Sequence, residues 1–107
     1  MPRSNGKQPF GDQRQQIIDA LAAYGKKHPK AKIDVQEPDW YSVRIRIIDP
    51  DFNGLDRVER DNKIWNLLDR LPEEVRMNIT LVLLLTPKET KTSLANFEFE
   101  NPVMAEN

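Results

Sequence analysis

The run from Ile79 to Leu85, ITLVLLL, constrains the fold more than any other part of this 107-residue sequence. Because it has no regular polar alternation and is too short for a helix with a solvent-exposed face, we predict a strand over 78–86. Such a strand must be covered on both faces or lie centrally in a sheet. The rest of the chain therefore has to supply neighbouring strands and a covering layer.

Two further runs alternate between apolar and polar residues and predict half-exposed strands. KIDVQ places Ile33 and Val35 on one face, which predicts a strand over 32–37. SVRIRIID alternates in the same way and predicts a strand over 42–49, with arginines on its second face. The intervening EPDWY is typical of a hairpin connection, so these two strands are expected to pair.

Two helices are predicted at the ends of the strand-forming region. The first, over 12–27, is expected to open with a capping box between Asp12 and Gln15. The last, over 87–94, is expected to open at TPKE, where Thr86 caps, proline takes the first helical position and glutamate completes the box.

A middle helix, continuous or broken, is predicted over 56–71. Asp56 and Glu59 have the spacing of a capping box, and Pro72 favours an end at the residue before it. Its apolar stripe consists of Val58, Ile64, Trp65, Leu68 and Leu71.

The order of these elements predicts an α+β fold in two layers. We expect a small three-stranded mixed sheet with helices packed mostly on one face. A single domain is predicted over 11–100, because the length suits one hydrophobic core. Residues 1–10 have no apolar periodicity and are expected to be a flexible lead-in, and 101–107 a flexible tail.

Composition excludes several classes of function. The chain has no cysteine, which rules out disulfides, thiolate nucleophiles and cysteine-ligated metal sites for this chain alone. Sixteen basic and seventeen acidic side chains give a net charge of -1, which argues against indiscriminate nucleic-acid binding. No signal-peptide core or membrane-spanning run is present, so we predict a cytoplasmic protein without a membrane partner.

The segment DFNGLDRVERDNKIW is either a binding loop or a helix start. Asp49, Asp51, Asn53 and Gly54 match the first half of an EF-hand calcium loop, but the twelfth position is an arginine and a strand precedes the loop. The simpler interpretation is a turn in which Gly54 is left-handed and Phe52 folds back beneath the helix. No metal and no other cofactor is therefore predicted.

The same segment resembles a known family. The strand VRIRIID, the turn and helix, and the apolar strand that ends in Thr-Pro are similar to BolA-like proteins. Their pattern is roughly F-x-G-x-x-x-V-x-R-H-x-x-[IV]-[YW], and the resemblance in element order covers 12–95. The matching positions are Phe52, Gly54, Val58, Arg60, Ile64 and Trp65.

The resemblance implies a class II KH-like fold and a role in nucleic-acid regulation or in iron–sulfur handling with monothiol glutaredoxins. The family's metal-ligand histidine, which follows the arginine, corresponds here to Asp61. The hairpin EPDWY holds neither cysteine nor histidine as a second ligand. Because a carboxylate is poorly suited to iron–sulfur coordination, no cluster is expected, and a monothiol glutaredoxin stays a partner to be tested.

Charged residues on the middle helix indicate a candidate binding surface. Arg57, Arg60 and Lys63 are expected on its solvated side, and acidic residues four positions before Arg60 and Lys63 favour a salt-bridged face over a dedicated patch. The hairpin indole of Trp40 is a second candidate contact. The predicted contacts to a protein partner or nucleic acid are Asn53, Gly54, Arg57, Arg60, Asp61, Lys63 and Trp40.

His28 is the sole histidine, and we expect it to be a solvated loop residue after the first helix. No nucleophile, orienting carboxylate or phosphate-binding loop accompanies it, so no catalytic residue is predicted. The leading hypothesis is a non-enzymatic BolA-like regulatory or adaptor module that acts through protein contacts. The alternative is a KH-like nucleic-acid-binding module that uses the loop and helix over 51–63, although Gly54 is the only glycine there for a G-x-x-G clamp.

Overall fold

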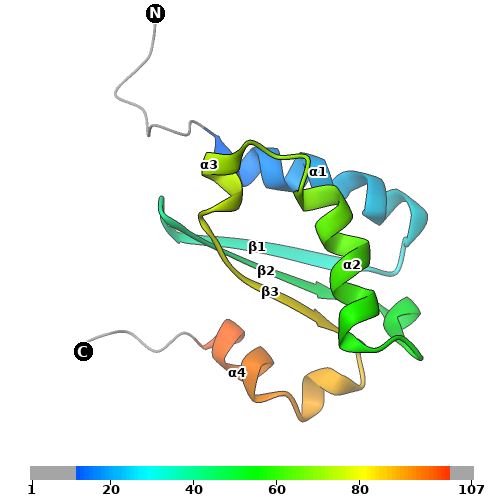
Figure 1. Ribbon diagram of the computed structural model, residues 1–107. Helices are drawn as coiled ribbons and strands as arrows, with labels where there is room; N and C mark the ends of the chain where they lie inside the picture. Colours follow the sequence, from blue (N-terminus) through cyan, green and yellow to red (C-terminus); the bar gives the residue numbers. More distant parts are fainter. Residues whose placement is uncertain (1–11, 102–107) are drawn as a thin grey trace, which may run out of the picture.

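The computed structural model describes residues 12–101, which form a mixed sheet with helices on both of its faces (Figure 1). No helix in this range is long and apolar enough to cross a membrane. The expected flexible segments lie outside it, apart from Asn101. In chain order the elements are α1 (Gln13–Lys27), β1 (Lys32–Asp39), β2 (Ser42–Ile48), η1 (Pro50–Phe52), α2 (Arg57–Leu68), α3 (Glu73–Arg76), β3 (Ile79–Leu85), η2 (Glu89–Lys91) and α4 (Leu94–Glu100).

The sheet has the order β1-β2-β3, with β2 in the centre. β1 pairs antiparallel with β2 through the predicted hairpin, and β3 pairs parallel with β2 after the crossover through α2 and α3. The α+β class, the three-stranded mixed sheet and all three strands are therefore confirmed. β3 lies at an edge rather than in the centre, and its apolar residues other than Leu84 are half-buried.

The hydrophobic core lies between the sheet and the layer of α1, α2 and α3. On β2, the alternation that predicted the strand puts Val43, Ile45 and Ile47 on this face, all with no exposed area. Phe52 is also fully buried, as predicted from the turn that follows β2. The other buried apolar members of this cluster are Ile17, Leu21, Tyr24, Val35, Ile64, Leu68, Val75 and Leu84.

Helices pack mostly on one face of the sheet, as predicted, and the last helix, α4, covers the opposite face (Figure 1). There the guanidinium of Arg46 stacks over the ring of Phe99 with a separation of 4.7 Å and donates to Asp34 and Glu100. Burial disfavours the charge of Arg46, but these hydrogen bonds outweigh it and raise its pKa above the ordinary value. The arginine face of β2 is therefore covered by charge pairing and an aromatic ring.

The predicted helix starts have different outcomes. At α2, Asp56 Oδ1 accepts from the Glu59 amide at 2.8 Å and Glu59 Oε1 accepts from the Asp56 amide at 2.9 Å, which confirms that capping box. At α1 the predicted box is wrong, because Asp12 makes no side-chain cap and Gln15 donates instead to Asp19. The helix forms over the predicted length without that cap.

The helix predicted over 87–94 is wrong, although its capping signal is real. The Thr86 amide donates to Glu89 Oε1 at 2.9 Å, and the Glu89 amide donates to Thr86 Oγ1 at 3.2 Å. This box opens only the short 3₁₀ turn η2. A new helix, α4, starts after Ser93, whose hydroxyl accepts from the Asn96 amide at 3.0 Å.

Two predicted members of the stripe on the middle helix differ in burial. Val58 is 65% exposed, so its assignment to the core is wrong. It lies in the first turn of α2. Trp65 is half-buried and packs against the edge of the core.

Gly54 has φ +86, so the predicted left-handed turn is confirmed, and no atom lies within 4 Å of a Cβ built there. We therefore expect Gly54→Ala to lower the free energy of unfolding by about 1 kcal/mol through backbone strain alone. Denaturant unfolding measures this loss.

Gly25→Ala in α1 is the matched control, because its added Cβ would meet only Ile33 Cδ1, at an ordinary 3.7 Å. Alanine in a helix should raise stability there by about 0.5–1 kcal/mol. Equal effects of the two substitutions would contradict the assignment of strain to Gly54.

Candidate functional site

The predicted contact residues fall at opposite ends of β2. Trp40 lies in the hairpin before β2, where it packs edge-on against the ring of Tyr41. Asn53 and Gly54 follow the other end of the strand and lead into α2. One surface thus cannot include Trp40 together with the loop and helix, so the predicted set divides into two.

A groove runs along the outer edge of β3, between the start of α2 and the segment that joins η2 to α4. Its volume is about 660 Å³. Of the predicted contacts, Arg57, Arg60 and Asp61 line it, whereas Asn53, Gly54 and Lys63 do not. The complete lining is Leu55, Asp56, Arg57, Arg60, Asp61, Leu81, Val82, Leu83, Leu84, Leu85, Glu89, Thr92, Ser93 and Ala95.

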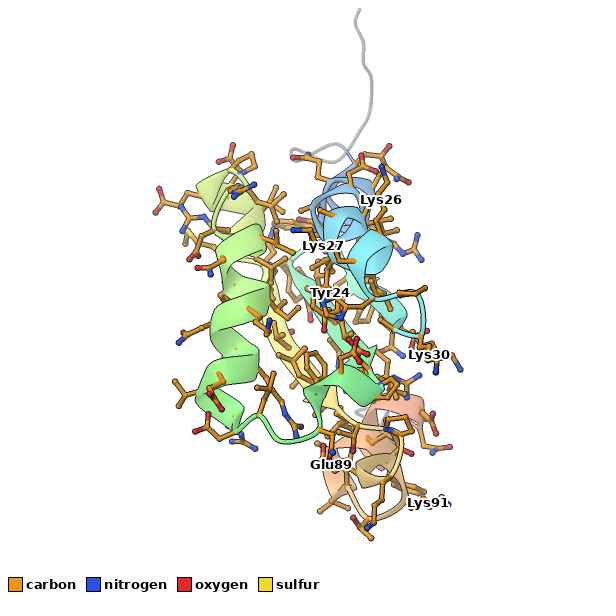
Figure 2. The ribbon with its side chains drawn as sticks, turned by 90° about the vertical axis from the view of Figure 1, so that its right-hand side faces the viewer. Tyr24, Lys26, Lys27, Lys30, Glu89 and Lys91 are labelled. Carbon is orange, nitrogen blue, oxygen red and sulfur yellow. The ribbon has the colours of Figure 1, made fainter. Side chains whose placement is uncertain are left out.

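Arg60 crosses one end of this groove as a clamp. Its guanidinium forms a two-pronged pair with Glu89, at 2.6 and 3.0 Å. It also donates to the main-chain oxygens of Leu55 at 3.0 Å and Leu84 at 3.1 Å. Figure 2 shows Glu89 at the lower end of the molecule, on the side of η2. The side chain therefore joins α2, β3 and η2.

The expectation that Arg60 is solvated is wrong, since its side chain is only 12% exposed. Reversal of this charge would break a structural contact as well as alter a surface. The predicted pair with Asp56 is replaced by the pair with Glu89, because the Asp56 carboxylate caps α2. The spacing of four residues in the sequence gave no sign of a partner that follows 29 positions later.

Arg57 and Lys63 are exposed, as predicted, but the expected pair between Glu59 and Lys63 is not present. Glu59 uses its carboxylate to accept from the Asp56 amide. Among the interactions recorded for residues 12–101, none engages the charged groups of Arg57 or Asp61. These two side chains therefore bring uncommitted charges of opposite sign to the groove.

The pair of Arg60 with Glu89 makes the stability of the folded protein depend on pH. The hydrogen bond from Arg60 is the main cause that lowers the pKa of Glu89 to about 2. A lowered folded-state pKa stabilises the protein above the ordinary carboxyl pKa, and this contribution is lost as pH falls towards 2. We expect Glu89→Gln to lower unfolding free energy at neutral pH by about 1 kcal/mol, because a side chain that is 42% exposed is screened by water.

Thermal unfolding of both proteins from pH 7 to pH 2 measures the contribution of the clamp. The difference in stability should shrink between about pH 4.5 and 2. A difference that stays constant over this range would show that the charge of Glu89 contributes nothing.

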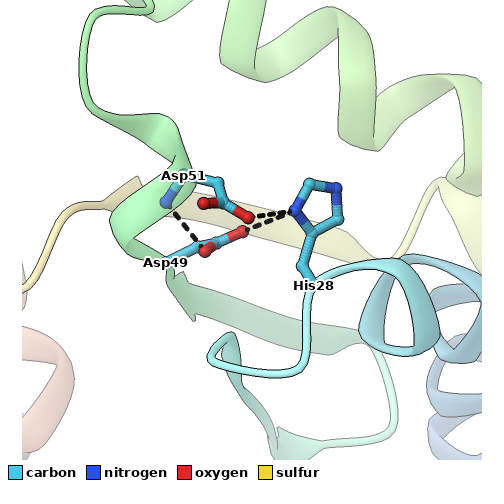
Figure 3. Close-up of side chains that lie close together, drawn as sticks. All are labelled: His28, Asp49 and Asp51. Carbon is cyan, nitrogen blue, oxygen red and sulfur yellow. Dashed lines mark hydrogen bonds and ion pairs between the residues drawn. The ribbon is translucent and has the colours of Figure 1, made fainter.

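A second cluster brings His28 together with Asp49 and Asp51 (Figure 3). His28 Nδ1 lies 2.7 Å from Asp51 Oδ2 and 3.4 Å from Asp49 Oδ2, and its ring stacks on Tyr24 with a centroid distance of 4.0 Å. The expectation that His28 is a solvated loop residue is therefore wrong. Its approach to the end of β2 is a tertiary contact that no local pattern indicates.

Asp49 has no exposed area, and the cluster satisfies its carboxylate. Oδ1 accepts from the Asp51 amide at 2.9 Å, and Oδ2 accepts from the Tyr24 hydroxyl. Burial, followed by the hydrogen bond to Asp49, raises the pKa of Tyr24, which therefore keeps its proton. The Asp49 and Asp51 carboxylates turn towards His28 and not into a calcium loop.

Histidine and carboxylates are also metal ligands, and the three ligand atoms lie within 4.8 Å of one another. In residues 12–101 this is the one such group. The mutual hydrogen bonds and the buried charge of Asp49 already account for the arrangement. The cluster therefore fits a structural junction between α1 and the loop after β2, and the absence of a bound metal stays a prediction.

Tyr24→Phe should lower the free energy of unfolding by about 1–3 kcal/mol, because it leaves a buried carboxylate with one donor fewer. Denaturant unfolding at pH 7 tests this, with Tyr41→Phe at the exposed hairpin as the control that should change little. Equal stability of wild type and Tyr24→Phe would show that water replaces the hydroxyl.

No protein-family model matches the sequence, and the search of curated proteins gave no match. Among solved structures, BolA1 from Arabidopsis thaliana is similar, with a TM-score of 0.51 and 17% identical residues over 73% of this chain and 95% of that chain. At this identity the likeness is one of fold. The fold is BolA-like, as the sequence resemblance implied.

Proposed function

We propose that this chain is a non-enzymatic adaptor module that acts through protein contacts in the groove beside β3. The observation that carries this proposal is the combination of an apolar wall with the uncommitted charges of Arg57 and Asp61. Leucine side chains supply contact area, while charges at the margin select a partner. The BolA-like fold supports a regulatory role, and a cytoplasmic location stays a prediction.

The charge of the groove favours a protein partner over nucleic acid. Asp56, Asp61 and Glu89 share the lining with Arg57 and Arg60, which leaves one negative charge in excess. Arg60 is committed to Glu89, so a single arginine is available for a phosphate. Nucleic-acid binding depends on several such contacts and on a positive surface. These observations therefore favour a protein partner over the KH-like alternative. Nucleic-acid binding is tested by its own titration.

The recorded contacts support a role without catalysis. In residues 12–101, His28 contacts two carboxylates and the ring of Tyr24, and no serine or threonine hydroxyl lies against it. A base without a nucleophile beside it does not match the arrangement of a nucleophilic hydrolase. No cofactor is proposed, and an apo monothiol glutaredoxin is one protein partner to test.

A charge-swap variant, Arg57→Glu with Asp61→Lys, tests the groove. Glutamate in the first turn suits the helix dipole, and position 61 is partly exposed, so the fold should persist. We expect proteins captured from native cell extract by wild type to include at least one that the variant loses. Purified partner should then bind the variant at least tenfold more weakly, by about 1.4 kcal/mol.

Lys27→Glu at the exposed end of α1 is the matched control, and it should retain the partner. Labelled single- and double-stranded nucleic acid is titrated at two salt concentrations in parallel. Salt-sensitive binding at micromolar protein that the charge swap removes, without loss of any protein partner, would replace the adaptor proposal by the KH-like alternative.

A further inference from the structure

The main-chain groups at the edge of β3 can be assigned a direction from two hydrogen bonds. Leu85 C=O accepts from the Asp49 amide at 2.9 Å, so Leu85 points towards β2. Leu84 C=O accepts from Arg60 on the other side at 3.1 Å, so Leu84 points outward. Main-chain groups alternate in this direction along a strand. The N–H and C=O of Leu83 therefore point towards β2, and those of Val82 point outward.

Val82 N–H, Val82 C=O and Leu84 N–H therefore face the groove. No main-chain partner is recorded for these three groups in the described part of the chain. The groove is lined by every residue from 81 to 85 in succession, which places the strand edge itself in its wall. An edge of this kind is a template for one more strand.

The flanks of the edge differ in chemistry. On the face towards α2, the groove presents Arg57 and Asp61, and on the other face it presents Leu81, Leu83 and Leu85. Side chains of an added strand alternate between these two faces. Arg60 and Glu89 neutralise each other, so Asp56, Arg57 and Asp61 leave one negative charge in excess on the side of α2, which favours a basic residue there. An occupant with apolar and basic residues in alternation is complementary to both.

We infer that the groove binds an extended segment of a partner protein, with alternating apolar and basic residues, as a fourth strand on β3. This inference rests on the proposed adaptor function and adds the mode of recognition. Main-chain hydrogen bonds to Val82 and Leu84 supply the alignment. The leucines on one side, and the acidic rim formed by Asp56 and Asp61 on the other, supply selectivity.

The probe is the peptide acetyl-Thr-Val-Lys-Val-Lys-Val-Thr-amide added to the full chain. We expect amide hydrogen exchange at Val82 and Leu84 to slow at least tenfold on saturation, while Leu83, already paired with β2, changes little. A peptide with glutamate in place of both lysines should bind at least tenfold more weakly. Unchanged exchange at Val82 and Leu84 with bound lysine peptide would overturn strand addition, as would a lack of peptide binding.

Two N-methylated peptides provide a matched pair, one methylated on its valine amides and one on its lysine amides. Only one set of amides can face β3, so one peptide should lose at least tenfold in affinity and the other should keep it. Equal affinity of both would also overturn the inference. Val82→Pro should weaken binding of the parent peptide. Leu83→Pro should disrupt the sheet, because of these two residues only Leu83 donates its amide hydrogen towards β2.

Other occupants give distinct results. Protection of the Val82 and Leu84 amides in a dimer without peptide would assign the edge to a second copy of the chain. Protection by a single-stranded oligonucleotide would assign it to nucleic acid. The last case is a protein partner that binds the wild type but not the charge-swap variant. If such a partner binds the wild type without protecting these amides from exchange, the adaptor proposal stands and strand addition is overturned.

Discussion

The groove and the elements around it depend on the hydrogen bonds that the guanidinium of Arg60 donates. Its donors reach the end of the loop before α2 at Leu55, the edge of β3 at Leu84 and the carboxylate of Glu89 in η2. A planar group with several fixed donors suits this position better than a lysine ammonium would. The same carboxylate of Glu89 accepts from the Thr86 amide, so the clamp and the turn after β3 share one acceptor.

A second arginine explains why the fold has a helix on each face of the sheet. Arg46 points away from the apolar core because β2 alternates, and it would lie on an open face without α4. Asp34 on the neighbouring strand, Asn96 and Glu100 supply acceptors, and Phe99 covers the group. Burial of a paired arginine costs desolvation, which its hydrogen bonds must offset. The second layer is thus fixed by polar complementarity more than by an apolar stripe.

The sequence was informative where the interactions are local. The capping box of α2, the left-handed Gly54 and the burial of Phe52 all depend on residues a few positions apart, and each was predicted correctly. β1 and β2 followed from their alternation for the same reason, and β3 followed from its short apolar run. These features need only the period of the chain and the stereochemistry of a turn.

Several of the missed features depend on a partner distant in the sequence, whereas the wrong capping box of α1 and the start of α4 at Ser93 are local. Arg60 had a plausible acid four positions before it, so local reasoning placed it in solvent, while the observed partner comes from η2. His28 is brought to Asp49 and Asp51 only when α1 packs on the sheet. Thr86 and Glu89 form the expected box, yet Ser93 starts the longer helix. The residues that line the groove come from three separate parts of the chain, and this explains why the predicted site was only partly correct.

The edge of β3 is protected against indiscriminate pairing at both of its ends. Near its start, the register with β2 shifts between Val43 and Arg44, so the ladder is irregular there. Near its end, Arg60 occupies the carbonyl of Leu84 and its pair with Glu89 crosses the groove. Between these two ends, the outward main-chain groups of Val82 and the Leu84 amide have no main-chain partner in the described chain. Because so short a window offers few main-chain bonds, any segment that binds there has to be selected by side chains against the leucines and the acidic rim.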